Sequence, residues 1–278
     1  MHILTIEGLT KRYPTFTLDS VSFSVKAGEI MGFIGRNGAG KTTTLKALLN
    51  IVHLDAGMVH FFDVPFVANE LAIKQRIGFV SGGIDYYPRS KLSAISEVTK
   101  RFYSSWDASV YREYMNLFAL DENKTPSQLS AGMKVKYNLA LALSHHAELL
   151  ILDEPTSGLD PVSRDELLDI FNMLAQKGTS ILFSTHITSD LDKCADRITY
   201  IRNGHILASE ELASFRQKYR ALTFSDDALT NEIRDKIIGL EPSKVGFTAI
   251  ALEADAQSLG LSGSTADLDT IMVHLEKE

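Results

Sequence analysis

Gly35-Arg36-Asn37-Gly38-Ala39-Gly40-Lys41-Thr42-Thr43 is the stretch that decides the fold of this 278-residue chain. It fits the phosphate-loop pattern G-x-x-x-x-G-K-[ST]. An apolar run at 30–34 precedes it and predicts a buried strand, and residues 44–49 predict a helix. Backbone N–H groups of such a loop, together with the helix N-terminus, converge on an anion. The context argues against a chance glycine-rich turn, and it predicts that Lys41 reaches the β- and γ-phosphates while Thr42 binds Mg²⁺.

Composition narrows the class of protein. Hydrophobic residues make up 45% and aromatic residues 9%, as in ordinary chains with a packed core. No stretch approaches the about 18 consecutive apolar residues of a membrane helix, and residues 1–7 lack the pattern of a signal peptide. Cys194 is the single cysteine, which excludes an intramolecular disulfide and a cysteine-based zinc site. A reducing compartment fits this composition, and we expect Cys194 to pack in the core.

The negative charge is concentrated near the C-terminus. The chain carries a net charge of −7, and positions 219–278 hold five basic and eleven acidic residues. A nucleic-acid-binding protein needs a basic face to neutralise phosphates, and this sequence offers none. We therefore expect no nucleic-acid partner.

A second motif pairs two carboxylates at the end of an aliphatic run. Leu149–Leu152 predicts a buried strand, and Asp153 and Glu154 follow it directly. Ligands bind at the carboxyl ends of parallel strands. Asp153 would hold Mg²⁺ through its water shell, and Glu154 would act as the general base, an effect of about 10²–10⁴-fold. If the strand expected at 179–184 is a neighbour, His186 after it can donate a hydrogen bond to the γ-phosphate.

Alternating residues ahead of the phosphate loop predict an antiparallel β flap. Strands are expected at 3–9 and 19–25, with a break at 11–14, and a further strand at 58–62. Tyr13 lies at the break. It can stack on a purine base or be a half-buried aromatic of the sheet, and the spacing leaves both readings open.

Residues 92–127 predict a helical insertion whose aromatic side chains form its own core, in preference to an aromatic ligand cage. Leu129-Ser130-Ala131-Gly132 then opens a helix expected at 133–144. A serine and a glycine at a helix start can bind an anion or simply cap the helix. His145-His146 would meet the negative end of that helix. The aromatic residues of the insertion are Phe102, Tyr103, Trp106, Tyr111, Tyr114 and Phe118.

The rest of the chain adds a helix that starts at Asp160-Pro161, with an apolar stripe, and a looser C-terminal region. Residues 221–225 and 245–252 look strand-like, and 268–275 looks helical. We expect this region to be a small acidic α+β appendage without a catalytic constellation.

Taken together, these motifs resemble an ATP-binding cassette (ABC) ATPase over about residues 2–215. The order matches: phosphate loop, the LSxG signature at 129–132, the carboxylate strand, the loop 157–160 and a histidine at 186. The resemblance implies an α/β fold with a P-loop NTPase core, an antiparallel β flap and a helical subdomain at about 90–146. Residues 1–215 would form the nucleotide-binding domain and 216–278 a small acidic α+β accessory region.

The resemblance also implies the site residues. Glu154, His186 and Lys41 would be catalytic, Thr42 and Asp153 would bind the metal, and Tyr13 would stack on adenine because Lys11-Arg12-Tyr13 matches the family pattern. The residues implied in binding ATP are Tyr13, Gly35, Arg36, Asn37, Gly38, Ala39, Gly40, Lys41, Thr42, Thr43, Ser130, Gly132 and Asp160.

In such a family, two cassettes pair head to tail around two ATP molecules, with Mg²⁺. Ser130 and Gly132 of one copy would close on the γ-phosphate held by Lys41 of the other. The pair would drive a separate membrane permease from the inner face of the cell membrane. The appendage and the stretch 102–107 look like bacterial exporter cassettes, some of them linked to antimicrobial compounds.

Two positions depart from the family pattern. Gly82 stands where the family usually has a glutamine that contacts Mg²⁺ and couples to the permease, and Met133 replaces the glutamine that usually follows the signature. A weakly hydrolysing regulatory cassette is therefore one alternative. A soluble ABC ATPase acting on ribosomes or DNA is another, although the missing basic surface argues against it.

Overall fold

Contacts within the described residues divide the protein into two compact units. The computed structural model describes residues 1–81, 87–225, 228–244 and 246–277. The first unit comprises Met1–Ala195 and Thr199–Ser209, and the second comprises Asp196–Ile198 and Glu210–Glu278. Within the second unit, the Leu212 N–H donates to the Asp196 carbonyl at 3.0 Å. The domain boundary at position 216 stays a prediction. Gly82 lies outside the described residues.

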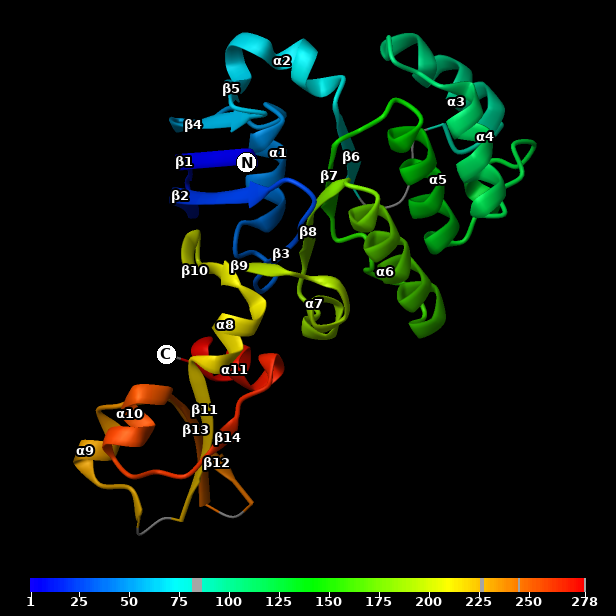
Figure 1. Ribbon diagram of the computed structural model, residues 1–278. Helices are drawn as coiled ribbons and strands as arrows, with labels where there is room; N and C mark the ends of the chain where they lie inside the picture. Colours follow the sequence, from blue (N-terminus) through cyan, green and yellow to red (C-terminus); the bar gives the residue numbers. More distant parts are fainter. Residues whose placement is uncertain (82–86, 226–227, 245, 278) are drawn as a thin grey trace. The chain divides into compact units, whose positions relative to one another are not determined.

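A mainly parallel sheet lies at the centre of the first unit (Figure 1). Its strands are, in spatial order, β10 (His205–Glu211), β9 (Arg197–Arg202), β3 (Ile30–Ile34), β8 (Ser180–Thr185), β7 (Leu149–Asp153) and β6 (Ile77–Ser81). Strands β3, β7 and β8 are buried throughout, which explains their continuous apolar sequences. The parallel register places Asp153 opposite Ser184 and Ile34 opposite Thr185. The motifs therefore end at one edge of the sheet.

An antiparallel sheet forms the flap, as predicted. Its strands are, in spatial order, β2 (Phe16–Lys26), β1 (His2–Tyr13), β4 (Ala56–Phe61) and β5 (Val64–Pro65). The expected break at 11–14 is wrong for Lys11, Arg12 and Tyr13, which remain paired with β2. Asp55 holds this end of β1, because it accepts hydrogen bonds from the Arg12 N–H at 2.7 Å and from Lys11 Nζ at 3.0 Å.

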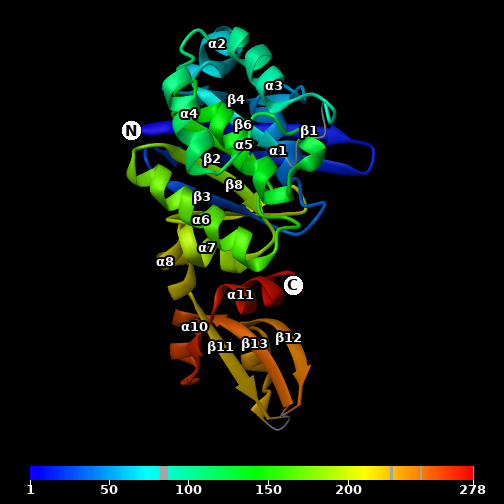
Figure 2. The ribbon, with the colours of Figure 1, turned by 90° about the vertical axis from the view of Figure 1, so that its right-hand side faces the viewer.

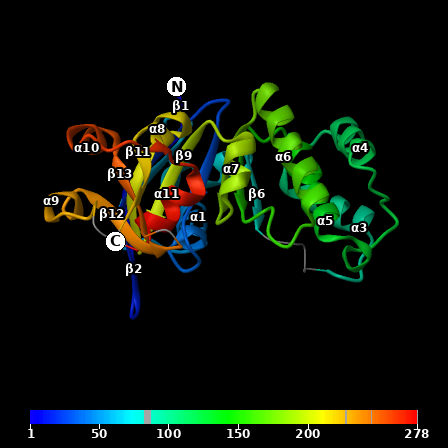
Figure 3. The same ribbon diagram turned by 90° about the horizontal axis from the view of Figure 1, so that it is seen from below.

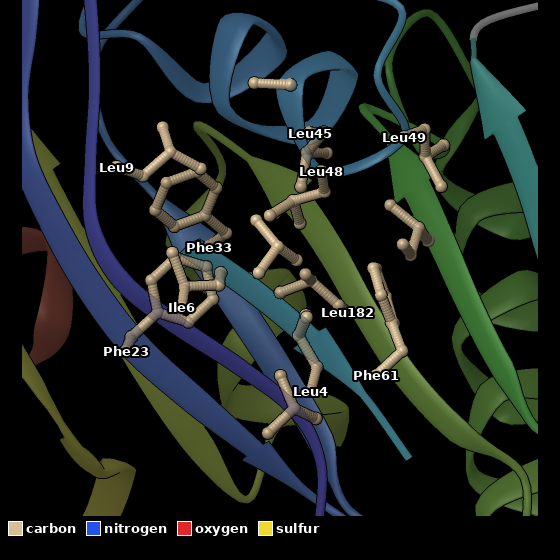
Figure 4. Packing of buried hydrophobic residues seen from close by; sticks show 14 of the residues in the cluster. Leu4, Ile6, Leu9, Phe23, Phe33, Leu45, Leu48, Leu49, Phe61 and Leu182 are labelled. Atoms are coloured by element: carbon tan, nitrogen blue, oxygen red, sulfur yellow. The ribbon is translucent and has the colours of Figure 1, made fainter. Parts of the chain in front are cut away.

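The main core fills the space between helix α1 (Lys41–Leu48) and the two sheets. Figure 4 shows Leu45 and Leu48 of α1 directed toward Phe33 of β3 and Ile6 of β1. Both leucines are fully buried, and burial of such a side chain contributes about 1.5–3 kcal/mol. This packing fixes the start of α1, and with it the phosphate loop.

Helices α6 (Pro161–Gln176) and α7 (Thr188–Cys194) pack against β3, and α6 also packs against β8. The apolar stripe expected on α6 is confirmed, since Leu167, Leu168, Phe171 and Leu174 are buried. Cys194 is buried, as expected. Among the described residues, no helix has the length and apolar character needed to cross a bilayer.

The helical region contains α5 (Ala131–Leu143), which lies beside α6 (Figure 3). Tyr111, Tyr114 and Phe118 are buried, in agreement with the predicted aromatic core. Phe102 is 71% exposed, so its place in that core is wrong. It is the last residue of a short 3₁₀ segment. The other elements of this part are α2 (Phe66–Lys74), α3 (Leu92–Thr99), η1 (Lys100–Phe102), α4 (Ala108–Leu117) and η2 (Pro126–Gln128).

His145 does not act as a cation at the end of α5, which corrects the expectation from the sequence. The side chain is 2% exposed and stacks on Tyr103 with a centroid distance of 3.7 Å. Its Nδ1 lies 3.1 Å from the Gln75 carbonyl oxygen, so the neutral ring donates there. Burial lowers the pKa of His145 to about 4.

Protonation of His145 should weaken the fold in acid. The unfolded chain takes up this proton near pH 6.5 and the folded chain only near pH 4, so stability falls as the pH drops through that window, by about 3 kcal/mol at pH 4. Urea unfolding followed by the fluorescence of Trp106, the single tryptophan, measures this loss. We expect His145→Phe, which keeps the ring stack, to flatten the profile.

Exposed His53 provides the matched control for that experiment. His53→Phe should retain the pH dependence of the wild-type protein. A His145→Phe profile that overlays the wild-type profile between pH 6.5 and 4 would contradict the assignment.

The second unit is an α+β structure, which agrees with the predicted appendage. Figure 2 shows β12 (Ile237–Ser243), β13 (Gly246–Leu252) and β11 (Tyr219–Phe224) side by side, and β14 (Ser264–Thr265) pairs with β11. The predicted strands and helix correspond to β11, β13 and α11, whereas β12 went unpredicted because Gly239 and Pro242 interrupt its pattern. The helices are α8 (Leu212–Gln217), α9 (Asn231–Arg234), α10 (Glu253–Ser258) and α11 (Leu268–Leu275).

Candidate active site

The phosphate loop connects β3 to α1, and it contains glycines at positions where a side chain would be strained or would clash. Gly38 and Gly40 have φ angles of +83° and +113°, which L side chains rarely adopt. A Cβ on Gly35 would lie 2.2 Å from the Ile201 carbonyl oxygen. Gly40 is also the N-cap of α1, so the unpaired N–H groups of the first helical turn face the end of the loop. The loop thus has the form of an anion cradle.

Lys41 is 4% exposed, and its ammonium group has three partners among the described residues. Its Nζ donates to the Gly35 carbonyl at 2.7 Å and to the Arg36 carbonyl at 3.3 Å. It also lies 3.2 Å from Oε1 of Glu154. A phosphate that binds Lys41 would replace the carboxylate, because the two carbonyl groups belong to the loop itself.

Asp153 and Thr42 form an oxygen-rich pair. Thr42 Oγ1 donates to Asp153 Oδ1 at 3.0 Å, and Ser184 Oγ donates to the same oxygen at 2.8 Å. Hydroxyl and carboxylate oxygens are the ligands that Mg²⁺ prefers, so the donor set fits this ion. Sequence reasoning missed Ser184, although its position at the end of β8, level with Asp153, was available as a signal.

The strands of Asp153 and His186 are neighbours, which is the condition on which the sequence prediction for His186 rested, and Glu154 and His186 are in contact. His186 Nδ1 lies 3.0 Å from Glu154 Oε2. The Glu154 backbone has a φ of +49°, which is unfavourable outside glycine, and its N–H donates to Ser184 Oγ at 2.9 Å. Surrounding contacts must hold this conformation, and such strain is frequent at functional sites.

Two cavities open around these groups. One of about 170 Å³ is lined by Phe16, Asn37, Gly38, Gly40, Lys41, Thr42, Thr43 and Glu154. Another of about 540 Å³ is lined by Thr42, Ser81, Ala131, Lys134, Val135, Asp153, Glu154, Pro155, Ser157 and Leu159. Thr42 and Glu154 belong to both. The phosphate loop and the carboxylates therefore face the same space, and the first turns of α5 reach it.

Tyr13 ends β1 and is 41% exposed, with Lys11 Nζ 5.8 Å from its ring centroid. Phe16 pairs with Tyr13 across the hairpin and lines the smaller cavity. Sequence reasoning missed Phe16. The only signal for it was that Phe16 is an aromatic residue across a tight turn from Tyr13. Within the loop, Arg36 contributes its carbonyl group to Lys41, and Ala39 is buried.

Ser130 and Gly132 lie at the start of α5 and, within the described part of the chain, line neither cavity. Ser130 is exposed and caps the helix by accepting the Met133 N–H at 3.2 Å. A Cβ on Gly132 would lie 3.4 Å from Ser163 Cβ, so this glycine permits close packing on α6.

Asp160 caps α6 by accepting the N–H groups of Val162 at 3.1 Å and Ser163 at 3.0 Å. Hydrogen bonds from the side chain and backbone of Ser163 lower the pKa of Asp160. Its described hydrogen bonds therefore serve the helix start, whereas its role toward ATP stays a prediction.

Comparisons with known proteins identify the family. The ABC transporter family pattern matches residues 18–157. The ABC transporter ATP-binding protein YtrB of Bacillus subtilis (strain 168) is 29% identical, over 86% of this chain and 83% of the relative. The bacitracin transport ATP-binding protein BcrA of Bacillus licheniformis is 32% identical, over 81% and 76%.

Comparison with solved structures indicates the same family. A solved ATP-binding subunit of an ABC transporter superposes with a TM-score of 0.69 at 26% identity, covering 77% of this chain and 92% of that one. Family pattern, relatives and fold agree with the resemblance drawn from the motifs. The chain therefore belongs to the ABC transporter family, as an ATP-binding subunit with the P-loop fold of its cassettes.

Proposed function

We propose that this subunit hydrolyses ATP to ADP and phosphate in the presence of Mg²⁺, and that it thereby drives a separate membrane permease. One observation carries the proposal: Lys41, Glu154 and His186 form a connected chain of contacts beside the Thr42–Asp153 pair. A cation that binds phosphates and a carboxylate that can orient water are parts that phosphoryl transfer to water uses, and the imidazole orients this carboxylate.

Each side chain has a role in that reaction. Lys41 binds the β- and γ-phosphates and neutralises their charge. Thr42 and Asp153 would hold Mg²⁺, which supplies positive charge to the phosphate oxygens when bound. His186 supports Glu154 through Nδ1 and reaches toward the γ-phosphate. The phosphate on Lys41 displaces Glu154, whose carboxylate then becomes available to a water molecule.

Hydrolysis transfers the γ-phosphoryl group to a water molecule. The water oxygen forms a bond to the γ-phosphorus, and the bond from that phosphorus to the bridging oxygen breaks. Glu154 accepts the proton of the attacking water, and ADP and phosphate leave.

A second copy of the chain would complete the site. Ser130 is exposed at the N-terminus of α5, a position that suits contact with the γ-phosphate held by another copy. Within one chain, Lys134 and Ala131 of the same helix line the larger cavity instead. ATP would thus join two subunits, and hydrolysis would separate them.

The names of the relatives support a role in transport. BcrA is described as a bacitracin transport protein, so export of an antimicrobial compound fits. The subunit would then lie on the inner face of the cell membrane, bound to its permease. Met133, in place of the usual glutamine, keeps a weakly hydrolysing regulatory cassette as the second candidate.

Phosphate release by the purified full-length chain tests the proposal. We expect turnover that requires Mg²⁺ and disappears with EDTA. Co-purification of a tagged chain with a multi-span membrane protein tests the permease. If the chain shows only background ATP turnover, both by itself and in complex with the membrane protein, the weakly hydrolysing regulatory cassette is favoured.

A further inference from the structure

A buried carboxylate outside the proposed catalytic groups joins three segments around the site. Asp190 of α7 has no exposed surface. Its Oδ2 accepts hydrogen bonds from Thr156 Oγ1 at 2.6 Å and from Thr185 Oγ1 at 3.0 Å. Its Oδ1 accepts a hydrogen bond from Arg164 Nε. A buried ion is stable only when paired and hydrogen-bonded in this way.

The partners of Asp190 stand next to the proposed catalytic residues. Thr156 follows Glu154 by two positions, and Thr185 immediately precedes His186. Both hydroxyl groups donate to the same carboxylate oxygen, and both threonines are almost fully buried. One atom of Asp190 therefore fixes the backbone on either side of the Glu154–His186 contact.

The third partner extends this anchor to α6. Arg164 lies one turn after Asp160, the N-cap of that helix, and its Nη2 also donates to Ser189 Oγ at 2.6 Å. Helix α6 in turn packs closely on Gly132 through Ser163. The carboxylate thus connects the loop after Glu154 to the helix beside the signature segment.

We infer that Asp190 is a positioning residue, which holds the loop 155–160 and the end of β8 so that Glu154 and His186 stay in contact. The inference rests on the proposed ATPase function, and it names Asp190 as the group that orients the general base Glu154. Glu154 needs such support because its φ of +49° is unfavourable without external contacts. Hydrogen bonds to a charged acceptor are stronger than those between neutral groups.

Removal of a hydroxyl group tests this better than removal of the charge. A change at Asp190 would leave the Arg164 cation unpaired and could unfold the region. Thr156→Val keeps the shape and removes only the bond between loop and carboxylate. Thr156→Ser restores the hydroxyl group. Thr199→Val is the matched control, since the Thr199 hydroxyl is also buried but bonds Ser209 Oγ, 2.9 Å away, outside the site.

Steady-state ATP hydrolysis by the full-length chain is the first measurement. For Thr156→Val we expect kcat to fall about tenfold or more with KM changed less than about twofold, because misplacement of a catalytic group affects the chemical step. Thr156→Ser and Thr199→Val should stay within about twofold of the wild-type kcat. A wild-type kcat in Thr156→Val, even with lower thermal stability, would mean a merely structural role and overturn the inference.

Hydrogen exchange of a peptide covering residues 155–160 separates this inference from the proposed function. The amides of Ser157 and Leu159 donate within this loop, to Glu154 and Thr156 carbonyl groups. We expect several-fold faster exchange there in Thr156→Val but not in Thr199→Val. If the wild-type protein shows no turnover either as the purified chain or in complex with its permease, only the ATPase proposal is refuted. Unchanged exchange in Thr156→Val refutes the positioning role, whatever the wild-type turnover is.

Discussion

Glu154→Gln is expected to reduce ATP turnover by about 10²–10⁴-fold, because glutamine cannot accept the proton of the attacking water. The same change should tighten ATP binding. In the structure, Lys41 lies 3.2 Å from the Glu154 carboxylate, so a phosphate must compete with that charge. The neutral amide removes the competitor and also the repulsion from the γ-phosphate. Turnover and the Kd for ATP are to be measured on the same preparation.

Glu148→Gln is the matched control, since Glu148 precedes the opposite end of β7 and pairs with Arg76. It should leave turnover and ATP affinity near the wild-type values. The Glu154→Gln chain should also form a dimer with ATP in size-exclusion chromatography with light scattering. Wild-type turnover in Glu154→Gln would exclude Glu154 as the base, and a monomer with bound ATP would exclude the head-to-tail pair.

The sequence predicts those parts of the site whose residues are contiguous. The phosphate loop at 35–43 and the pair Asp153-Glu154 each occupy a single turn or strand end, so local pattern alone places them. His186 was predicted from strand adjacency, and the parallel pairing of β7 with β8 satisfies that condition. The convergence of all three follows from one physical fact, that parallel strands end at the same edge.

Contacts between distant segments were beyond the sequence. Ser184 reaches Asp153 only because β8 pairs in register with β7, and Asp190 gathers partners from separate elements. Ser184 offered only its place at the end of a strand as a signal, and Asp190 left neither a periodic nor a local one. Phe16 had only its place across a turn from Tyr13 as a signal, because it lines the site through the fold of a hairpin.

Two errors share a cause, which is that tertiary partners override local preference. Lys11 and Arg12 look like a polar break, yet Asp55 supplies a partner that keeps them in β1. His145 looks like a helix-end cation, yet Tyr103 and the Gln75 carbonyl surround it and favour the neutral ring. In both cases the deciding residue lies more than 40 positions away or in another element.

Lys41→Met is expected to weaken ATP binding by about 10²–10³-fold, equivalent to about 3–4 kcal/mol. Methionine preserves the apolar stem in a position that is 4% exposed, but it removes the only ammonium group that contacts Glu154 in the described structure. The phosphates then lose a desolvated, charge-assisted partner, while the loop N–H groups remain. Titration with a fluorescent ATP analogue gives the affinity, and turnover should disappear at ordinary ATP concentrations.

Lys46→Met provides the comparison, because Lys46 lies on the same helix but in its last turn, away from the phosphate loop. It should bind the analogue with an affinity close to that of the wild-type chain. Since Lys41 and Glu154 are partners before ATP binds, the double variant Lys41→Met, Glu154→Gln should regain part of the lost affinity: the phosphates then meet neither the lysine nor the uncompensated carboxylate. Equal affinity in Lys41→Met and in the double variant would show that the Glu154 carboxylate does not repel the phosphates once Lys41 is gone.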